Sequence, residues 1–213
     1  MAEIRGEPSQ LDVLLPRDLA AASTRLILTR WAAGAIVILA TAASQRLLGV
    51  ILPATGLYII GLFILVYNTA LSLLAQRAAS PDPAVYLTRL RRLVVLQVSL
   101  DWLCMASFLH LTGGITSPAI VFLLIHMLMV TILLPGVSSY LYVALGVGGL
   151  LVLALLEASG ALALYTVLAA LPSDLYRDPL FIASQIVFFA AAAISTVTLA
   201  TGIMGQLLNR ERQ

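Results

Sequence analysis

The sequence has little charge. Only 10% of its 213 residues are Asp, Glu, Lys or Arg, and none of them is lysine. Soluble domains carry about 25% charged and about 45–50% apolar residues, whereas 61% of this chain is hydrophobic. Long apolar runs recur along the chain and leave no room between them for a folded kinase, nucleotidase or nucleic-acid-binding domain. The composition predicts an integral membrane protein surrounded by the lipid bilayer, with no nucleic acid partner.

Cysteine is almost absent too. The single residue, Cys104, lies within an apolar run and excludes an intramolecular disulfide. The first 25 residues mix acidic and basic side chains. They lack the basic start and short apolar core of a cleaved signal peptide, so we expect this segment to be retained.

Proline, glycine and small polar residues divide the apolar sequence into six predicted helices. A membrane β-barrel would instead show alternating segments of about ten residues, a pattern that we do not find in the sequence. We predict an all-α, polytopic membrane protein with six transmembrane helices. The predicted domains are an N-terminal segment (1–25), either interfacial or a free tail, the helical domain (26–206) and the start of a cytoplasmic signalling helix (207–213). The predicted helices are 30–48, 54–75, 92–111, 118–134, 140–160 and 180–206.

Arginine placement predicts the orientation. In a six-span arrangement only Arg46 and Arg177 fall on one side, and the other ten arginines fall on the opposite side. Because basic residues collect on the cytoplasmic side, we expect both termini in the cytoplasm. The ten arginines are Arg5, Arg17, Arg25, Arg30, Arg77, Arg89, Arg91, Arg92, Arg210 and Arg212.

Four ionisable residues are predicted inside the spans: Asp101, His110, His126 and Glu157. Such residues are costly in lipid and are candidates for function. Asp101 and His126 are predicted to differ in depth by only about 6 Å, so they could form a proton relay or a pair that fixes helix packing. Glu157 comes about one turn before the outer end of its helix, where we expect a rim residue that reaches water.

The densest polar cluster between spans follows the third helix. Paired glycines allow positive φ and close approach, and a Ser-Pro pair can begin the next helix. This segment predicts a ligand-binding loop, with a tight hairpin turn as the alternative. The candidate ligand-binding residues are His110, Thr112, Gly113, Gly114, Ser117, Pro118 and, deeper in the membrane, His126.

Haem binding is another possibility that the two histidines raise. Haem held by both histidines is disfavoured because His110 lies about two turns nearer the outer surface than His126, although haem held by one of them stays open. We predict no metal site and no catalytic residue.

In the last helix, Ala192, Thr196 and Ala200 form a row of small residues that predicts either a homodimer interface or packing within the bundle.

The chain resembles the membrane input domains of bacterial sensor histidine kinases of the redox-responsive RegB type. The resemblance rests on Asp101, on the segments 110–114, 117–118 and 122–126, and on the helical exit at 205–212. In the family, a glycine pair followed by Asn-Pro-Phe is associated with quinone sensing. Ser117 and Ala119 replace the Asn and Phe here. The resemblance implies a multi-pass protein of the bacterial cytoplasmic (inner) membrane.

Taken together, these features predict the sensor module of a two-component signalling protein. We expect it to detect a membrane-soluble redox ligand such as quinone and to relay the signal through its last helix to a cytoplasmic kinase domain. The 213 residues contain no such domain and, as given, are not expected to catalyse a reaction. The alternatives are an accessory structural subunit of a membrane complex and a haem-binding or proton-relay protein.

Overall fold

The computed structural model describes residues 16–47, 51–78, 80–134, 137–165, 172 and 174–211. Within these ranges it is all-helical, with no strand. Its elements are α1 (Pro16–Arg46), α2 (Ala54–Arg77), α3 (Pro83–Leu111), the 3₁₀ turn η2 (Gly114–Thr116), α4 (Ile120–Leu133), α5 (Val137–Ala158), the 3₁₀ turn η3 (Leu175–Arg177) and α6 (Pro179–Glu211).

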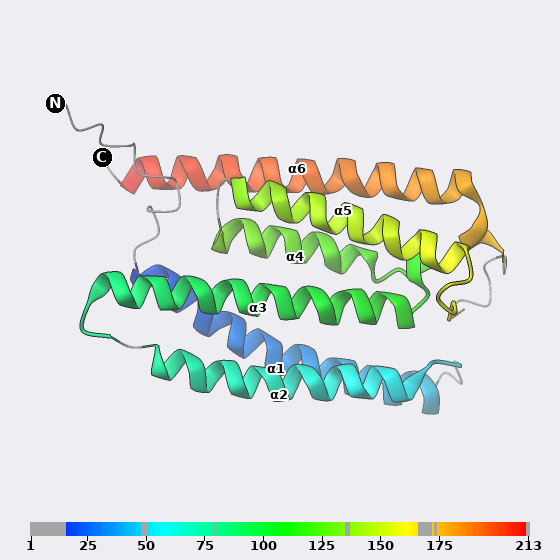
Figure 1. Ribbon diagram of the computed structural model, residues 1–213, viewed down its shortest axis with the longest axis horizontal. Helices are drawn as coiled ribbons and strands as arrows, with labels where there is room; N and C mark the ends of the chain where they lie inside the picture. The colour runs from blue at the N-terminus through cyan, green and yellow to red at the C-terminus, as the bar shows by residue number, and fades with distance from the viewer. Residues whose placement is uncertain are drawn as a thin grey trace.

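The helices run up and down in the order of the sequence (Figure 1). The beginning of α1 and the end of α6 lie at the same end of the molecule. Five helices are long and apolar enough to cross a membrane, and α4, with 14 residues, is the shorter one. The predicted helical membrane protein is therefore confirmed. At 1.5 Å per residue α4 spans only about 21 Å of a hydrocarbon core about 30 Å thick.

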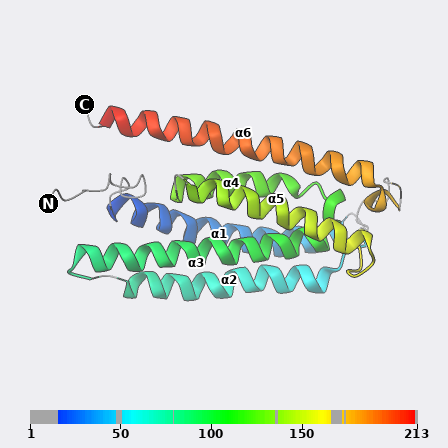
Figure 2. The ribbon, with the colours of Figure 1, turned by 45° about the horizontal axis from the view of Figure 1, so that its top comes forward.

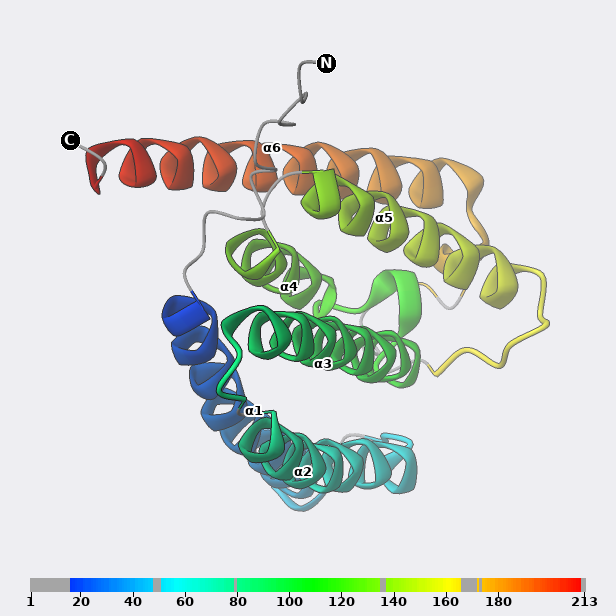
Figure 3. The ribbon, with the colours of Figure 1, turned by 60° about the vertical axis from the view of Figure 1, so that its left-hand side comes forward.

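Two groups of three helices make up the bundle. Viewed nearly end-on, α1, α2 and α3 lie together and α4, α5 and α6 lie together (Figure 3). Two apolar cores fill the bundle. One is centred on residues such as Leu71 and Val94 and includes Val130 of α4, and the other is centred on Met127 and Ala193 and includes Leu109 of α3. Helices α3 and α4 contact each other and join the groups. The long α6 runs along the outside of α4 and α5 (Figure 2).

Helices α1 and α2 approach each other closely at two glycines. A Cβ atom added to Gly34 would lie 3.1 Å from the carbonyl oxygen of Gly61, and one added to Gly61 would lie 3.2 Å from that of Gly34. Small residues let helix backbones come together where lipid supplies no hydrophobic drive. This crossing fixes α1 against α2.

Two predicted helix starts were wrong. Helix α3 begins at Pro83 instead of residue 92, and α1 begins at Pro16 instead of residue 30. The side chain of Asp82 accepts hydrogen bonds from the backbone N–H groups of Ala84 and Val85, which caps the first turn of α3. The sequence-based spans began where charge ended, but arginines can sit on a helix whose apolar stretch lies further along.

Candidate functional site

A buried ion pair joins α1 to α3. The guanidinium of Arg30 donates to both carboxylate oxygens of Asp101, at 2.8 Å from Nε and 2.6 Å from Nη2. The hydroxyl of Tyr67 on α2 donates to the same carboxylate at 2.6 Å. Only 6% of each charged side chain is exposed. One carboxylate therefore ties three helices together with three charge-assisted hydrogen bonds.

Arg30 was not predicted from the sequence as a candidate functional residue. It was assigned to the cytoplasmic start of the first helix, but it lies six residues inside the apolar stretch Thr24–Arg46. Two features could have found it: it has apolar neighbours on both sides, and a carboxylate at the depth of Asp101 needs a cation. The charge of Arg30 thus neutralises Asp101 instead of marking a membrane boundary.

The hydrogen bonds of Asp101 go to Arg30 and Tyr67, and none joins it to His126. His126 lies in the middle of α4, within electrostatic range of Asp101 and Arg30. Its Nε2 atom is buried without a hydrogen-bond partner in the described part of the chain. The direct pair considered from the sequence is therefore not formed, and the partners of Asp101 come from α1 and α2.

A second buried pair lies at the opposite end of α3 from the arginine-rich start. Nδ1 of His110 is 2.8 Å from Oε1 of Glu157 on α5. The Glu157 side chain is completely buried, whereas that of His110 is 21% exposed. The predicted rim position of Glu157 was wrong, because α5 turns this side chain toward α3 and the loop after it, where His110 meets the carboxylate.

The glycine pair serves this second site. Gly113 and Gly114 have φ values of +117° and +55°, in the region that residues with a Cβ rarely adopt. A Cβ at Gly114 would overlap the carboxylate of Glu157. The first glycine therefore lets the chain turn after α3, and the second also makes room for the buried carboxylate.

The remaining polar groups of the predicted ligand loop bond to one another. The hydroxyls of Thr112 and Ser117 are 2.8 Å apart, and the Ser117 hydroxyl also accepts from the backbone N–H of Ala119. The backbone N–H groups of Thr116 and Ser117 donate to the carbonyls of the glycine pair. Ser117 is 3% exposed, while Pro118 is exposed. The loop is thus a packed turn, and its outward-facing neighbour is His110.

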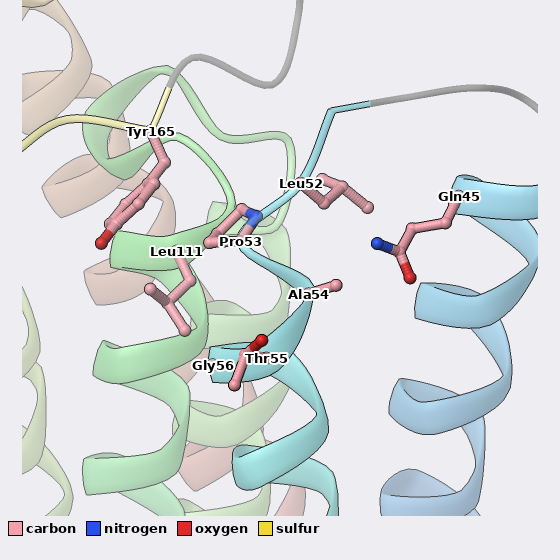
Figure 4. Close-up of a pocket in the computed structure, with 8 residues that line it drawn as sticks. All are labelled: Gln45, Leu52, Pro53, Ala54, Thr55, Gly56, Leu111 and Tyr165. Atoms are coloured by element: carbon pink, nitrogen blue, oxygen red, sulfur yellow. The ribbon is translucent and has the colours of Figure 1, made fainter.

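A pocket of about 390 Å³ opens beside this turn (Figure 4). It lies where the end of α1, the beginning of α2 and the end of α3 meet. Leu111, the neighbour of His110, forms one wall, and Gln45 extends its amide from α1 toward α2 across the opening. The lining residues are Gln45, Leu52, Pro53, Ala54, Thr55, Gly56, Leu111 and Tyr165.

Tyr165 connects the pocket to the buried pair. Tyr165 lines the pocket, and its ring meets the His110 ring edge-on, with ring centroids 5.4 Å apart. Pocket, Tyr165, His110 and Glu157 therefore form a continuous series of contacts from the molecular surface to α5. We refer to these four elements as the outer site. Sequence reasoning found His110 and missed the pocket, because its walls come from segments far apart in the chain.

Comparisons with models of protein families, with curated proteins and with solved structures found no match. The relationship to sensor kinases consequently stays a prediction from the motif residues.

The small residues predicted as a dimer interface lie on α6. Ala192, Thr196 and Ala200 are half-buried, beside the face by which Ala193 and Val197 of α6 pack into the second apolar core. Within the described ranges no three His, Cys, Asp or Glu side chains gather as metal ligands would. Within the same ranges, no hydrogen bond joins His110 to His126.

Proposed function

We propose that this protein is a membrane-embedded sensor module of a two-component signalling protein and that it binds a lipid-soluble ligand of the quinone class at the outer site. The observation that carries the proposal is the contact series from the pocket through Tyr165 to the His110–Glu157 pair. We place both termini in the cytoplasm of a bacterium, so that the outer site faces away from it.

The pocket suits a quinone ring. Its volume of about 390 Å³ falls in the usual range for small-molecule sites. Leu52, Pro53 and Leu111 supply apolar surface, whereas the Gln45 amide and the Thr55 hydroxyl can hydrogen-bond the two ring oxygens. We place the pocket near the membrane surface, because its walls come from the ends of α1 and α3 and the beginning of α2, where a membrane-soluble molecule could reach it.

His110, whose side chain is 21% exposed, gives the site a means to respond. Reduction of a quinone to a quinol takes up two electrons and two protons, which turns two acceptor oxygens into hydroxyl groups. A histidine held by a buried carboxylate can accept a hydrogen bond or donate one, depending on its tautomer and charge. The two redox forms would therefore bind the outer site with different strength, as a change of state requires.

The path to the cytoplasm runs through α5 and α6. Glu157 is on α5, which packs against α6, and α6 is 33 residues long, or about 50 Å. A ligand that moves Tyr165 would disturb the His110–Glu157 contact between α3 and α5. We propose that this shifts α5 against α6 and changes the position of the helical exit near Glu211, where a kinase domain would connect.

Ligand binding can be tested with a short-chain quinone and the purified full chain in detergent. Leu111→Trp fills the pocket, and the matched control Leu103→Trp places the same ring on the lipid-facing side of α3, where Leu103 is 58% exposed. We expect quinone to raise the melting temperature of the wild type and of Leu103→Trp, but not of Leu111→Trp. No shift in the wild type, or equal shifts in all three proteins, would contradict the proposal.

A further inference from the structure

A second pocket is lined by residues from the end of α2 and the first turns of α3. These helix ends lie at the opposite end of the bundle from the outer site (Figure 1). The volume of the pocket is about 300 Å³. Three arginines and three leucines supply most of its lining: Arg77, Arg89, Arg92, Leu74, Leu93 and Leu96. None of these residues belongs to the outer site.

Charged and apolar residues follow the same order on both helices. On α2, Arg77 is the last residue and Leu74 lies one turn deeper in the span. On α3, which runs the other way, Arg89 and Arg92 come first, and Leu96 lies one turn beyond Arg92. The pocket thus has a basic mouth, formed by the last residue of α2 and by the second and third turns of α3, and apolar walls toward the membrane interior. An amphiphile with an anionic head has the complementary order.

The three arginines are available to an anion. In the described part of the chain, no ion pair or hydrogen bond engages the guanidinium of Arg77, Arg89 or Arg92, and all three side chains are exposed. The nearest acidic residue in the sequence, Asp82, uses its carboxylate to cap α3. Among the described residues, the mouth therefore carries positive charge that no acidic side chain compensates.

We infer that this pocket, which we call the basic pocket, binds an anionic phospholipid from the membrane leaflet at this end of the bundle. The arginines bind the phosphate of the lipid, and an acyl chain lies along Leu74 and Leu96. Guanidinium groups match phosphate oxygens in geometry and charge. The two leucines are 46% and 44% exposed, and an acyl chain would cover them. Basic pockets between helices at the cytoplasmic side are suited to lipid headgroups. The inference is independent of quinone binding.

The inference can be tested by native mass spectrometry of the full chain in detergent. Phosphatidylglycerol, phosphatidylcholine and water-soluble glycerol 3-phosphate are added in separate titrations. We expect saturable binding of one phosphatidylglycerol molecule, much weaker binding of the zwitterionic lipid, and no competition by glycerol 3-phosphate at equal concentration. Equal binding of both lipids would overturn the anionic site, and effective competition by glycerol 3-phosphate would overturn the role of the acyl chain.

Two variants locate the site. Arg89→Gln/Arg92→Gln removes two charges from the mouth, and we expect phosphatidylglycerol affinity to fall about fivefold for each. The control Arg25→Gln removes an exposed arginine of α1 at the same end of the bundle but outside the basic pocket, and should change affinity little. Melting temperatures verify that each variant is folded. Equal affinity of the double variant and the wild type would overturn the assignment.

Discussion

Two buried acid–base pairs of this protein differ in how completely they are enclosed. Arg30 and Asp101 are each 6% exposed, and Tyr67 adds a third hydrogen bond. In the outer site Glu157 is fully buried, but His110 is 21% exposed and touches a ring that lines a pocket. In the first pair both carboxylate oxygens of Asp101 accept hydrogen bonds from other helices, so the pair holds helices together. The second has one partner, His110, that contacts a tyrosine of the pocket lining.

The comparison has a physical basis in the membrane. A lone charge in the hydrocarbon core is costly, and removing one member of a buried pair leaves the other uncompensated. A pair near the surface can recruit water when its partner changes. The Arg30–Asp101 pair, which we call the inner pair, should therefore dominate stability. The His110–Glu157 pair, the outer pair, should dominate the response to a ligand.

The largest expected effect comes from breaking the inner pair on one side only. Asp101→Leu leaves the Arg30 guanidinium buried without its carboxylate, and we expect a loss of about 3–5 kcal/mol in the free energy of unfolding. The measurement is denaturant unfolding in mixed micelles. As a control, Arg30→Met/Asp101→Leu removes both charges and should recover most of the loss. A double variant as unstable as the single one would show that the charges themselves are not the cause.

The next effect comes from the turn that holds Glu157. Gly114→Ala forces a Cβ into a left-handed backbone position and against the buried carboxylate, so we expect a loss of about 2–3 kcal/mol in the same assay. Gly148→Ala on α5 is the matched control, because no atom lies within 4 Å of the added Cβ. The control should be unchanged or slightly stabilised, and a similar loss in both would contradict the role of Gly114.

Removal of one hydrogen bond from the inner pair sharpens the comparison. Tyr67→Phe keeps the ring and deletes the donor to Asp101. We expect a loss of about 1.5–2 kcal/mol, typical of a hydrogen bond to a charged group. The matched control is Tyr140→Phe, since Tyr140 is 44% exposed on α5. Equal stability of Tyr67→Phe and the wild type would indicate that the ion pair between α1 and α3 does not depend on the hydroxyl from α2.

The smallest stability effect is expected at the outer site. Glu157→Gln keeps an oxygen that can accept from the His110 ring and removes only the charge, so the loss should be below about 1 kcal/mol. Its quinone-dependent shift in melting temperature should nevertheless disappear. If the variant kept the full shift in melting temperature, the charge of Glu157 would not be needed for ligand binding.

The helical fold could be predicted from apolar runs and their breakers, and the structure confirms an all-helical chain with helices that are long and apolar enough to span a membrane. Helix starts were less predictable, because Arg30 and Arg89 lie on helices that continue past them. His110 and the glycine pair were correctly brought together, since they are neighbours in sequence. The partners Arg30, Glu157 and Tyr165 depend on tertiary packing, which periodicity and composition do not specify.

Labelling with a photoreactive quinone tests the central assignment most directly. The full chain in detergent is irradiated with an azidoquinone, and the modified peptides are identified by mass spectrometry with and without excess unlabelled quinone. We predict competable labelling at residues 52–56 and at Tyr165, which line the pocket of the outer site. Competable labelling around His126 in α4 instead, or labelling that excess quinone does not reduce, would contradict the account.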